Sequence, residues 1–295
     1  MILNVSGRTD IVAFYTDWFM NRYREGFVDV RNPFHQKLVS RIFFSNVDAI
    51  FFCTKNPIPI LHHIKEIEKP ILFHVTVTPY LSDIEPNVPN KKDVISAIKE
   101  LSSILGKDRV VVRYDPIFLS DKYTVDYHIK MFSRVCEQLE GSIEKIIVSF
   151  LDDYKNVRKN RRVLKYKSFQ ESDYKRIGES FSKSAKEHGI LVQTCFEERN
   201  LVEYGFVRGD CLSSELAYSL TGKKYPKWKA RKGGLCQCVQ MVDIGVYNTC
   251  NHLCKYCYAN YDEESIEKNR KMHDPDSSLL IGNLEEDDII KERVK

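Results

Sequence analysis

The chain has 295 residues, 43% of them hydrophobic, and a formal net charge of +4 with an isoelectric point near 8.4. This length and hydrophobic content allow one large domain or two small ones and argue against intrinsic disorder. The charge is too small to indicate a nucleic-acid-binding protein by itself. Because no apolar run reaches the roughly 18 residues of a membrane helix, and none precedes Arg8, we expect a cytoplasmic protein without membrane contact.

Short β-branched and aromatic runs alternate with helix-like segments along the chain. The runs predict strands at 2–5, 49–53, 71–78, 110–113, 146–150, 190–193 and 242–246, and apolar stripes predict helices at 10–25, 93–105 and 173–188. This alternation is typical of βα units, and no Gly-x-Gly-x-x-Gly follows any strand. We therefore predict an α/β fold, a (β/α) TIM-type or partial barrel.

Three segments interrupt this pattern. Residues 27–44 predict a hairpin insertion, residues 195–257 are rich in cysteine, and residues 262–295 predict a charged helix and tail. The barrel is expected to be a single domain over residues 1–261.

Polar residues follow several of the predicted strands, where (β/α) barrels keep their active sites. The candidates for catalysis are Arg8, Asp10, Arg113 and Asp115, and those for cofactor binding are Ser6, Gly7, Lys55 and Asn56. Arg113 and Asp115 suit binding of a carboxylate or ribose and proton transfer, but equally a structural salt bridge. The same alternative applies to Arg8 and Asp10, while Asn56 before proline also suits a simple turn.

Seven of the nine cysteines fall between positions 195 and 257, which in a reducing compartment indicates metal. Cys250, Cys254 and Cys257 have the spacing C-x3-C-x2-C, which suits three corners of a 4Fe-4S cluster with one iron left open. Tyr256 precedes the last of them and is expected near the cofactor. The alternative is zinc on the same cysteines with His252 or His273.

A second group offers four more thiols, at Cys195, Cys211, Cys236 and Cys238. Four thiolates suit a second Fe-S cluster or a structural zinc, and ordinary buried thiols are the alternative. Cys53, Cys136 and His74 are expected in the core.

Two basic runs with aromatic neighbours lie at 155–167 and 223–232. Such runs suit phosphate contacts and base stacking, although most exposed lysines only form a solvated face.

The run Cys250-Asn-His-Leu-Cys254-Lys-Tyr-Cys257 resembles the cluster loop of the radical S-adenosylmethionine (radical SAM) superfamily. Further runs along nearly the whole chain resemble the bacterial family called domain of unknown function 1848. These runs are Arg8-Thr-Asp-Ile, Arg31-Asn-Pro-Phe, Thr54-Lys-Asn-Pro, Arg113-Tyr-Asp-Pro, Thr194-Cys and Cys236-Gln-Cys.

In the superfamily the cluster loop follows the first strand, whereas here it follows the last predicted one. The resemblance therefore implies a circularly permuted radical SAM barrel with 242–246 beside 2–5. Ser6 and Gly7 would stand where the superfamily has its Gly-Gly-Glu turn, which this chain lacks, and Asp10 would supply the carboxylate.

The resemblance also implies a 4Fe-4S cluster that binds and cleaves S-adenosylmethionine, and a reductant protein such as a ferredoxin or flavodoxin. The substrate is not implied. One alternative is a non-catalytic binding protein, stabilised by Fe-S or zinc, with nucleic acid as its partner. Another is a zinc-dependent hydrolase using His252 or His273 with Asp115 as base, although the histidine spacing fits no zinc-protease motif.

Overall fold

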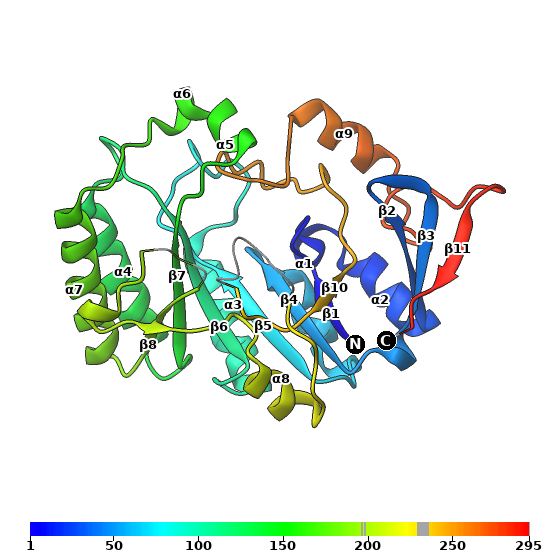
Figure 1. The fold of residues 1–295 in the computed structure, drawn as a ribbon, viewed down its shortest axis with the longest axis horizontal. Helices are drawn as coiled ribbons and strands as arrows, with labels where there is room; N and C mark the ends of the chain where they lie inside the picture. The colour runs from blue at the N-terminus through cyan, green and yellow to red at the C-terminus, as the bar shows by residue number, and fades with distance from the viewer. Residues whose placement is uncertain (196, 198, 229–235, 295) are drawn as a thin grey trace.

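The computed structural model describes residues 1–195, 197, 199–228 and 236–294. In this part of the chain eight parallel strands form the main sheet, in the order β10-β1-β4-β5-β6-β7-β8-β9 (Figure 1). The strands are β1 (Ile2–Val5), β4 (Ala49–Thr54), β5 (Ile71–Thr76), β6 (Val110–Ile117), β7 (Lys145–Phe150), β8 (Leu191–Thr194), β9 (Val207–Arg208) and β10 (Met241–Asp243). The α/β class is thus confirmed.

The strand order places the last strand of the sheet beside the first. Leu3 of β1 lies opposite Val242 of β10 in parallel register, so the expected pairing of these two strands is confirmed. The sheet ends at β9 and β10, which do not pair with each other among the described residues, so a closed barrel is not seen. β10 is shorter than predicted, because Asp243 accepts a hydrogen bond from Gly245 N at 2.8 Å and turns the chain.

Both faces of the sheet are covered, since successive side chains along a strand point to opposite faces. Leu3, Phe52 and Val112 lie on the outer face and share one core with the long helices. Ile2 and Phe51 lie on the inner face, in a second core to which α8 contributes. The helices are α1 (Ile11–Phe14), α2 (Thr16–Glu25), α3 (Lys91–Leu105), α4 (Val125–Leu139), α5 (Lys155–Lys159), α6 (Arg161–Leu164), α7 (Glu171–Glu187), α8 (Ser214–Thr221) and α9 (Glu263–Lys271), with 3-10 turns at Phe44–Asn46, Ile58–Glu66 and Val202–Tyr204.

The helix predicted at 10–25 is two helices that meet at Tyr15. Asp10 caps α1 by accepting a hydrogen bond from Ala13 N at 2.9 Å. Tyr15 leaves the helical conformation and its hydroxyl donates to Thr249 O at 2.7 Å. The break thus ties the start of the chain to the loop that carries the cysteine triplet.

The predicted hairpin is present as β2 (Phe27–Asn32) and β3 (His35–Phe43), which pair antiparallel. The tail is more than the helix α9, because β11 (Ile289–Glu292) pairs with β3 and completes a three-stranded sheet. Arg41 holds Asp29 through two hydrogen bonds of 2.9 and 2.8 Å within it. This small sheet lies at the end of the molecule near α2 (Figure 1).

Among the helices of the described residues, none combines the length and the apolar character needed to cross a membrane.

Candidate functional site

The cysteine triplet lies on the long loop that follows β10. Cys250 is buried, and the other two cysteines are half-buried. Asparagine side chains hold this loop in place: Asn260 Nδ2 donates to Cys250 O at 2.8 Å, and Asn156 Nδ2 donates to Asn260 O at 3.0 Å. Asn160 Nδ2 donates to Lys255 O at 2.7 Å. Because Asn156 and Asn160 lie at α5, that short helix positions the triplet.

The three thiols lie in an environment that disfavours their ionisation. Burial raises the pKa of Cys250, Cys254 and Cys257, and the Lys55 ammonium partly opposes this for the last two. Metal ligation would therefore release protons and would strengthen as pH rises.

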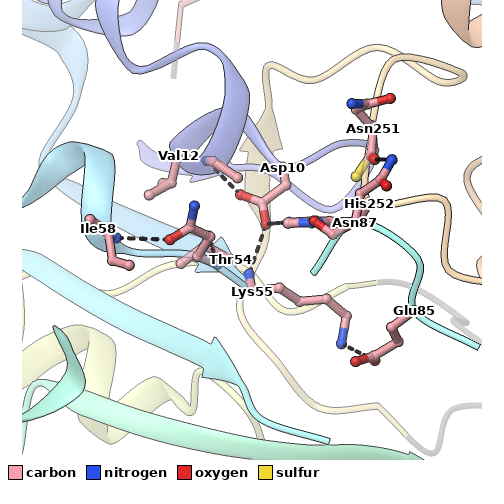
Figure 2. Close-up of polar contacts among 12 residues, drawn as sticks. Asp10, Val12, Thr54, Lys55, Ile58, Glu85, Asn87, Asn251 and His252 are labelled. Atoms are coloured by element: carbon pink, nitrogen blue, oxygen red, sulfur yellow. Dashed lines mark hydrogen bonds and ion pairs between the residues drawn. The ribbon is translucent and has the colours of Figure 1, made fainter. Parts of the chain in front are cut away.

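Lys55 also belongs to a buried network around Glu85. Lys55 Nζ lies 2.9 Å from the carboxylate, which also accepts hydrogen bonds from Thr78, Lys91 and Tyr256. Burial would raise the pKa of Glu85, but the two ammonium groups lower it to about 2. Tyr256 is therefore enclosed beside the triplet, with Lys55 Nζ 5.4 Å from its ring centroid. Figure 2 shows Lys55 reaching toward Glu85.

Asp10 uses both carboxylate oxygens within the protein (Figure 2). Oδ1 caps α1, and Oδ2 lies 2.7 Å from Lys55 N and 2.9 Å from His252 Nε2. The other ring nitrogen of His252 lies 3.3 Å from Asn87 O. Asp10 and His252 thus join the first strand end, the second strand end and the triplet loop.

Two further candidates also have local contacts. Asn56 Oδ1 accepts a hydrogen bond from Ile58 N at 3.2 Å, which is the turn geometry that was the alternative to ligand binding. His273 Nδ1 lies 2.8 Å from Leu280 O and its ring packs edge-on against Tyr15.

The turn after β1 is organised by Asp243, a residue to which the sequence assigned no role. Its carboxylate accepts hydrogen bonds from Ser6 Oγ at 2.8 Å and Gly7 N at 2.6 Å, and Asn4 Nδ2 donates at 2.9 Å. Arg8 Nε lies 4.0 Å from the same carboxylate. A Cβ on Gly7 would lie 3.2 Å from Asp243 Oδ2, so glycine suits this close approach. Asp243 reaches this turn only because β1 pairs with β10, so the arrangement cannot be read from the sequence.

Arg113 and Asp115 form an ion pair on the inner face of the sheet. Arg113 Nε lies 2.9 Å from Asp115 Oδ2, and Ser149 Oγ also donates to that carboxylate. Arg113 Nη1 donates to Cys211 Sγ at 3.0 Å. The salt bridge is thus present, and it also connects the predicted rim residues to the second cysteine group.

Three of the four cysteines in the second group converge on one point. The sulfur atoms of Cys195, Cys211 and Cys238 all lie within 4.8 Å of one another, so the group could bind a metal ion. The sulfur atoms of Cys195 and Cys211 are 2.8 Å apart, and the thiol of Cys236 is within hydrogen-bonding reach of Cys238. Hydrogen bonds with Cys195 and Cys238, helped by the Arg113 guanidinium, lower the pKa of Cys211 well below its ordinary value.

The core assignments hold for Cys136 and His74, which are buried, whereas Cys53 is half-buried. Neither ring nitrogen of His74 has a hydrogen-bond partner among the described residues. Burial lowers the pKa of His74 to about 3, so its ring is neutral. It lies on β5 next to β6, which carries Arg113.

Glu85 is a central residue that sequence reasoning missed. It lies in a loop of ordinary turn residues, 81–90, with no periodicity that indicates burial. No sequence signal pointed to Glu85, because its importance follows from the mostly buried ammonium of Lys55, which only the fold shows.

A family model described as Domain of unknown function (DUF1848) matches residues 2–259. The chain belongs to the DUF1848 family. The matched range contains the main sheet and all residues of both cysteine groups, and it ends before α9. No curated protein matches the chain.

The DUF1848 range also contains both basic runs. In the first, Arg158 Nη1 lies 3.0 Å from Asp153, and Lys167 pairs with Asp121. In the second, Lys223 Nζ lies 2.6 Å from Asp48, while residues 229–232 fall outside the described residues. Part of the positive charge is therefore shared with carboxylates.

Proposed function

We propose that this chain is an iron-sulfur enzyme of the radical SAM type. In this proposal Cys250, Cys254 and Cys257 hold a 4Fe-4S cluster whose open iron binds S-adenosylmethionine. The observation that carries it is the position of the triplet loop, which follows β10 at the same end of the sheet as the Ser6–Arg8 turn after the neighbouring strand β1. The carboxyl ends of parallel strands are where such sheets bind ligands.

The donor set fits a cluster better than a zinc ion. Zinc bound by three thiolates would need a fourth ligand, and the histidines nearest in sequence are His252 and His273. His252 contacts Asp10 and Asn87 O through its two nitrogens, and His273 contacts Leu280 O. In the described part of the chain, the sulfur atoms of the triplet also do not all lie within 4.8 Å of one another. A cluster of four irons separates its thiolates further than a single ion does.

When bound, the cluster would pass one electron from a reductant protein, such as a ferredoxin or flavodoxin, to S-adenosylmethionine and so open a route to radical chemistry. The chain itself supplies charge and enclosure. Lys55 places an ammonium beside the thiolates, where their negative charge needs compensation. Tyr256 packs with Cys254 and is held by Glu85, so the two side chains shield the half-buried Cys254 on one side.

The turn after β1 supplies candidate contacts for the methionine part of the cofactor. Arg8 has a partly exposed side chain whose contacts to Asp243 and Gly245 O are long, at 4.0 and 3.5 Å, so its guanidinium can bind a carboxylate. Asp10 has both oxygens occupied and therefore holds the site together. In this proposal Arg113 and Asp115 lie deeper on the inner face and orient the substrate.

The test is anaerobic purification with iron and sulfide analysis, followed by electron paramagnetic resonance of the reduced protein with and without S-adenosylmethionine. We expect about four irons per chain and a signal that changes when S-adenosylmethionine is added. The triplet variant Cys250→Ala/Cys254→Ala/Cys257→Ala should lose both. Cys136→Ala, which removes a buried cysteine of α4, is the matched control and should keep them.

Two results would contradict the proposal. A wild-type protein reconstituted with iron and sulfide that retains no iron has no cluster at the triplet. A cluster whose signal ignores S-adenosylmethionine would instead indicate an electron-transfer or structural role.

A further inference from the structure

We infer that Cys195, Cys211, Cys236 and Cys238 bind a single Zn²⁺ ion that ties the two edges of the main sheet together. This site is separate from the triplet, and the inference does not rest on the proposed radical chemistry. Of the two metals that the sequence left open for these cysteines, a second Fe-S cluster and a structural zinc, we thus choose zinc.

The distances between the sulfur atoms favour a single zinc ion. A tetrahedral ion with zinc-sulfur bonds of about 2.3 Å places its thiolates about 3.8 Å apart. The sulfur atoms of Cys195, Cys211 and Cys238 lie within 4.8 Å of one another, with 2.8 Å between the first two. Widening that contact by about 1 Å would produce the zinc geometry. A four-iron cube in the same place would require a much larger separation.

The ligand set can close with one small movement. Cys236 is within hydrogen-bonding reach of Cys238 but outside the group of three sulfur atoms, so a shift of its side chain toward that group would complete four thiolates and leave no coordination position open for a substrate or water. Three of the four cysteines are buried and the fourth is half-buried. Closed sets of four cysteines are typical of structural zinc, whereas the triplet leaves a position open.

A positively charged side chain lies against the sulfur atoms. Four thiolates around Zn²⁺ carry a net charge of −2, which a buried site must compensate. Arg113 Nη1 already donates to Cys211 Sγ at 3.0 Å. Its guanidinium is held in turn by Asp115. Such contacts to the ligands of a metal orient them and adjust their charge.

The backbone holds the two halves of the site side by side. Val239 N donates to Leu212 O at 3.1 Å, and Gln237 N donates to Asp210 Oδ1 at 3.1 Å. The chain around Cys236 and Cys238 therefore runs along the chain around Cys211. These bonds place the ligands before any metal is bound.

The position in the fold explains what the ion would do. Cys195 follows β8 and Cys211 follows β9, at one edge of the sheet. Cys236 and Cys238 precede β10, which forms the opposite edge. Since β9 and β10 do not pair among the described residues, a metal at this point replaces the hydrogen bonds that would close a barrel.

The test uses the full chain, purified anaerobically from medium that contains both iron and zinc. We expect about one zinc per chain, with X-ray absorption at the zinc edge showing four sulfur neighbours at about 2.3 Å. The triplet variant should lose iron and keep zinc. Cys195→Ser/Cys238→Ser should lose zinc, and Cys136→Ala should keep both metals.

Each remaining outcome overturns the inference. Iron and sulfide that persist in the triplet variant without zinc would show a second Fe-S cluster. Absence of zinc from the wild-type protein, or zinc neighbours that include nitrogen, would exclude a four-thiolate ion. If Cys195→Ser/Cys238→Ser does not fold, the absorption spectrum of the triplet variant still decides. Because zinc and iron are measured separately, failure here is distinct from failure of the proposed cluster.

Discussion

At the scale of single residues, the site depends on buried charges that compensate one another. Glu85 is buried and faces the ammonium groups of Lys55 and Lys91. Without this carboxylate the two charged lysine side chains would destabilise the fold, because an uncompensated buried charge costs several kcal/mol. Glu85 therefore links the stability of the fold to the electrostatics of the triplet.

The variant Glu85→Gln keeps the size of the side chain and removes its charge. We expect the free energy of unfolding at pH 7 to fall by about 3–5 kcal/mol, since the mostly buried ammonium of Lys55 and the partly exposed ammonium of Lys91 lose their buried carboxylate partner. Urea denaturation monitored by circular dichroism measures this change. The pKa of Glu85 is lowered to about 2 from an ordinary value of 4.5. Its stabilising contribution is therefore complete above pH 4.5 and declines as pH falls toward 2.

Glu66→Gln is the matched control, because Glu66 also pairs with basic side chains but at an exposed position. Exposed pairs contribute little. A similar loss of stability in the two variants would show that Glu85 is not a compensating charge in a dry environment.

His128 gives a prediction of pH dependence outside the metal sites. Burial lowers its pKa to about 4, while Nε2 contacts Phe118 O at 2.9 Å and Nδ1 contacts the Tyr114 hydroxyl at 3.1 Å. In the unfolded chain the ring binds a proton near pH 6.5, so stability must decrease as pH falls from 6.5 toward 4. Between pH 7 and pH 5 we expect the wild type to lose about 2 kcal/mol more than His128→Gln. Equal losses in urea unfolding at the two pH values would disprove this.

At the scale of elements, the short helix α5 supports the triplet loop. Asn156 is buried and its Nδ2 donates to two loop carbonyls, Tyr258 O at 2.8 Å and Asn260 O at 3.0 Å. Asn156→Ala leaves both carbonyls without this donor. We expect less iron per chain and amide exchange in the loop about tenfold faster, since such losses cost about 1–3 kcal/mol. Zinc content should not change.

Asn21→Ala is the control, because Asn21 also donates two side-chain hydrogen bonds but at an exposed position on α2. Iron content that is the same in Asn156→Ala and wild type would mean that α5 does not position the triplet.

The elements also show what could be read from the sequence. Buried parallel strands produce continuous apolar runs, so seven strands of the main sheet were predictable, whereas the two-residue strand β9 was not. The break at Tyr15 was not, because it depends on Thr249, which is distant in sequence. The same holds for Glu85 and Asp243, whose partners come from other strands and loops. Cysteine spacing indicated both groups, but only the fold shows Arg113 against Cys211.

At the scale of the whole molecule, the order of strands in space differs from their order in the chain. The last strand of the main sheet, β10, lies beside β1, and the chain must cross from β9 to reach it. Cys211, Cys236 and Cys238 lie on this crossing, and Cys195 lies between β8 and β9. If the inferred zinc is present, it couples two edge strands, β9 and β10, that do not pair with each other among the described residues.

This coupling predicts a pattern of hydrogen exchange. In Cys195→Ser/Cys238→Ser, amides of β8 and β10 should exchange together, about tenfold faster or more, because losing the link costs at least 1.4 kcal/mol of local stability. Amides of β2 and β3 should not change, since the small sheet is stabilised by its own pairs, such as Arg41 with Asp29. The triplet variant is the control and should leave β8 protected. Faster exchange in β8 alone would show that the metal holds only its own edge, and faster exchange everywhere would indicate global unfolding instead of a link between edges.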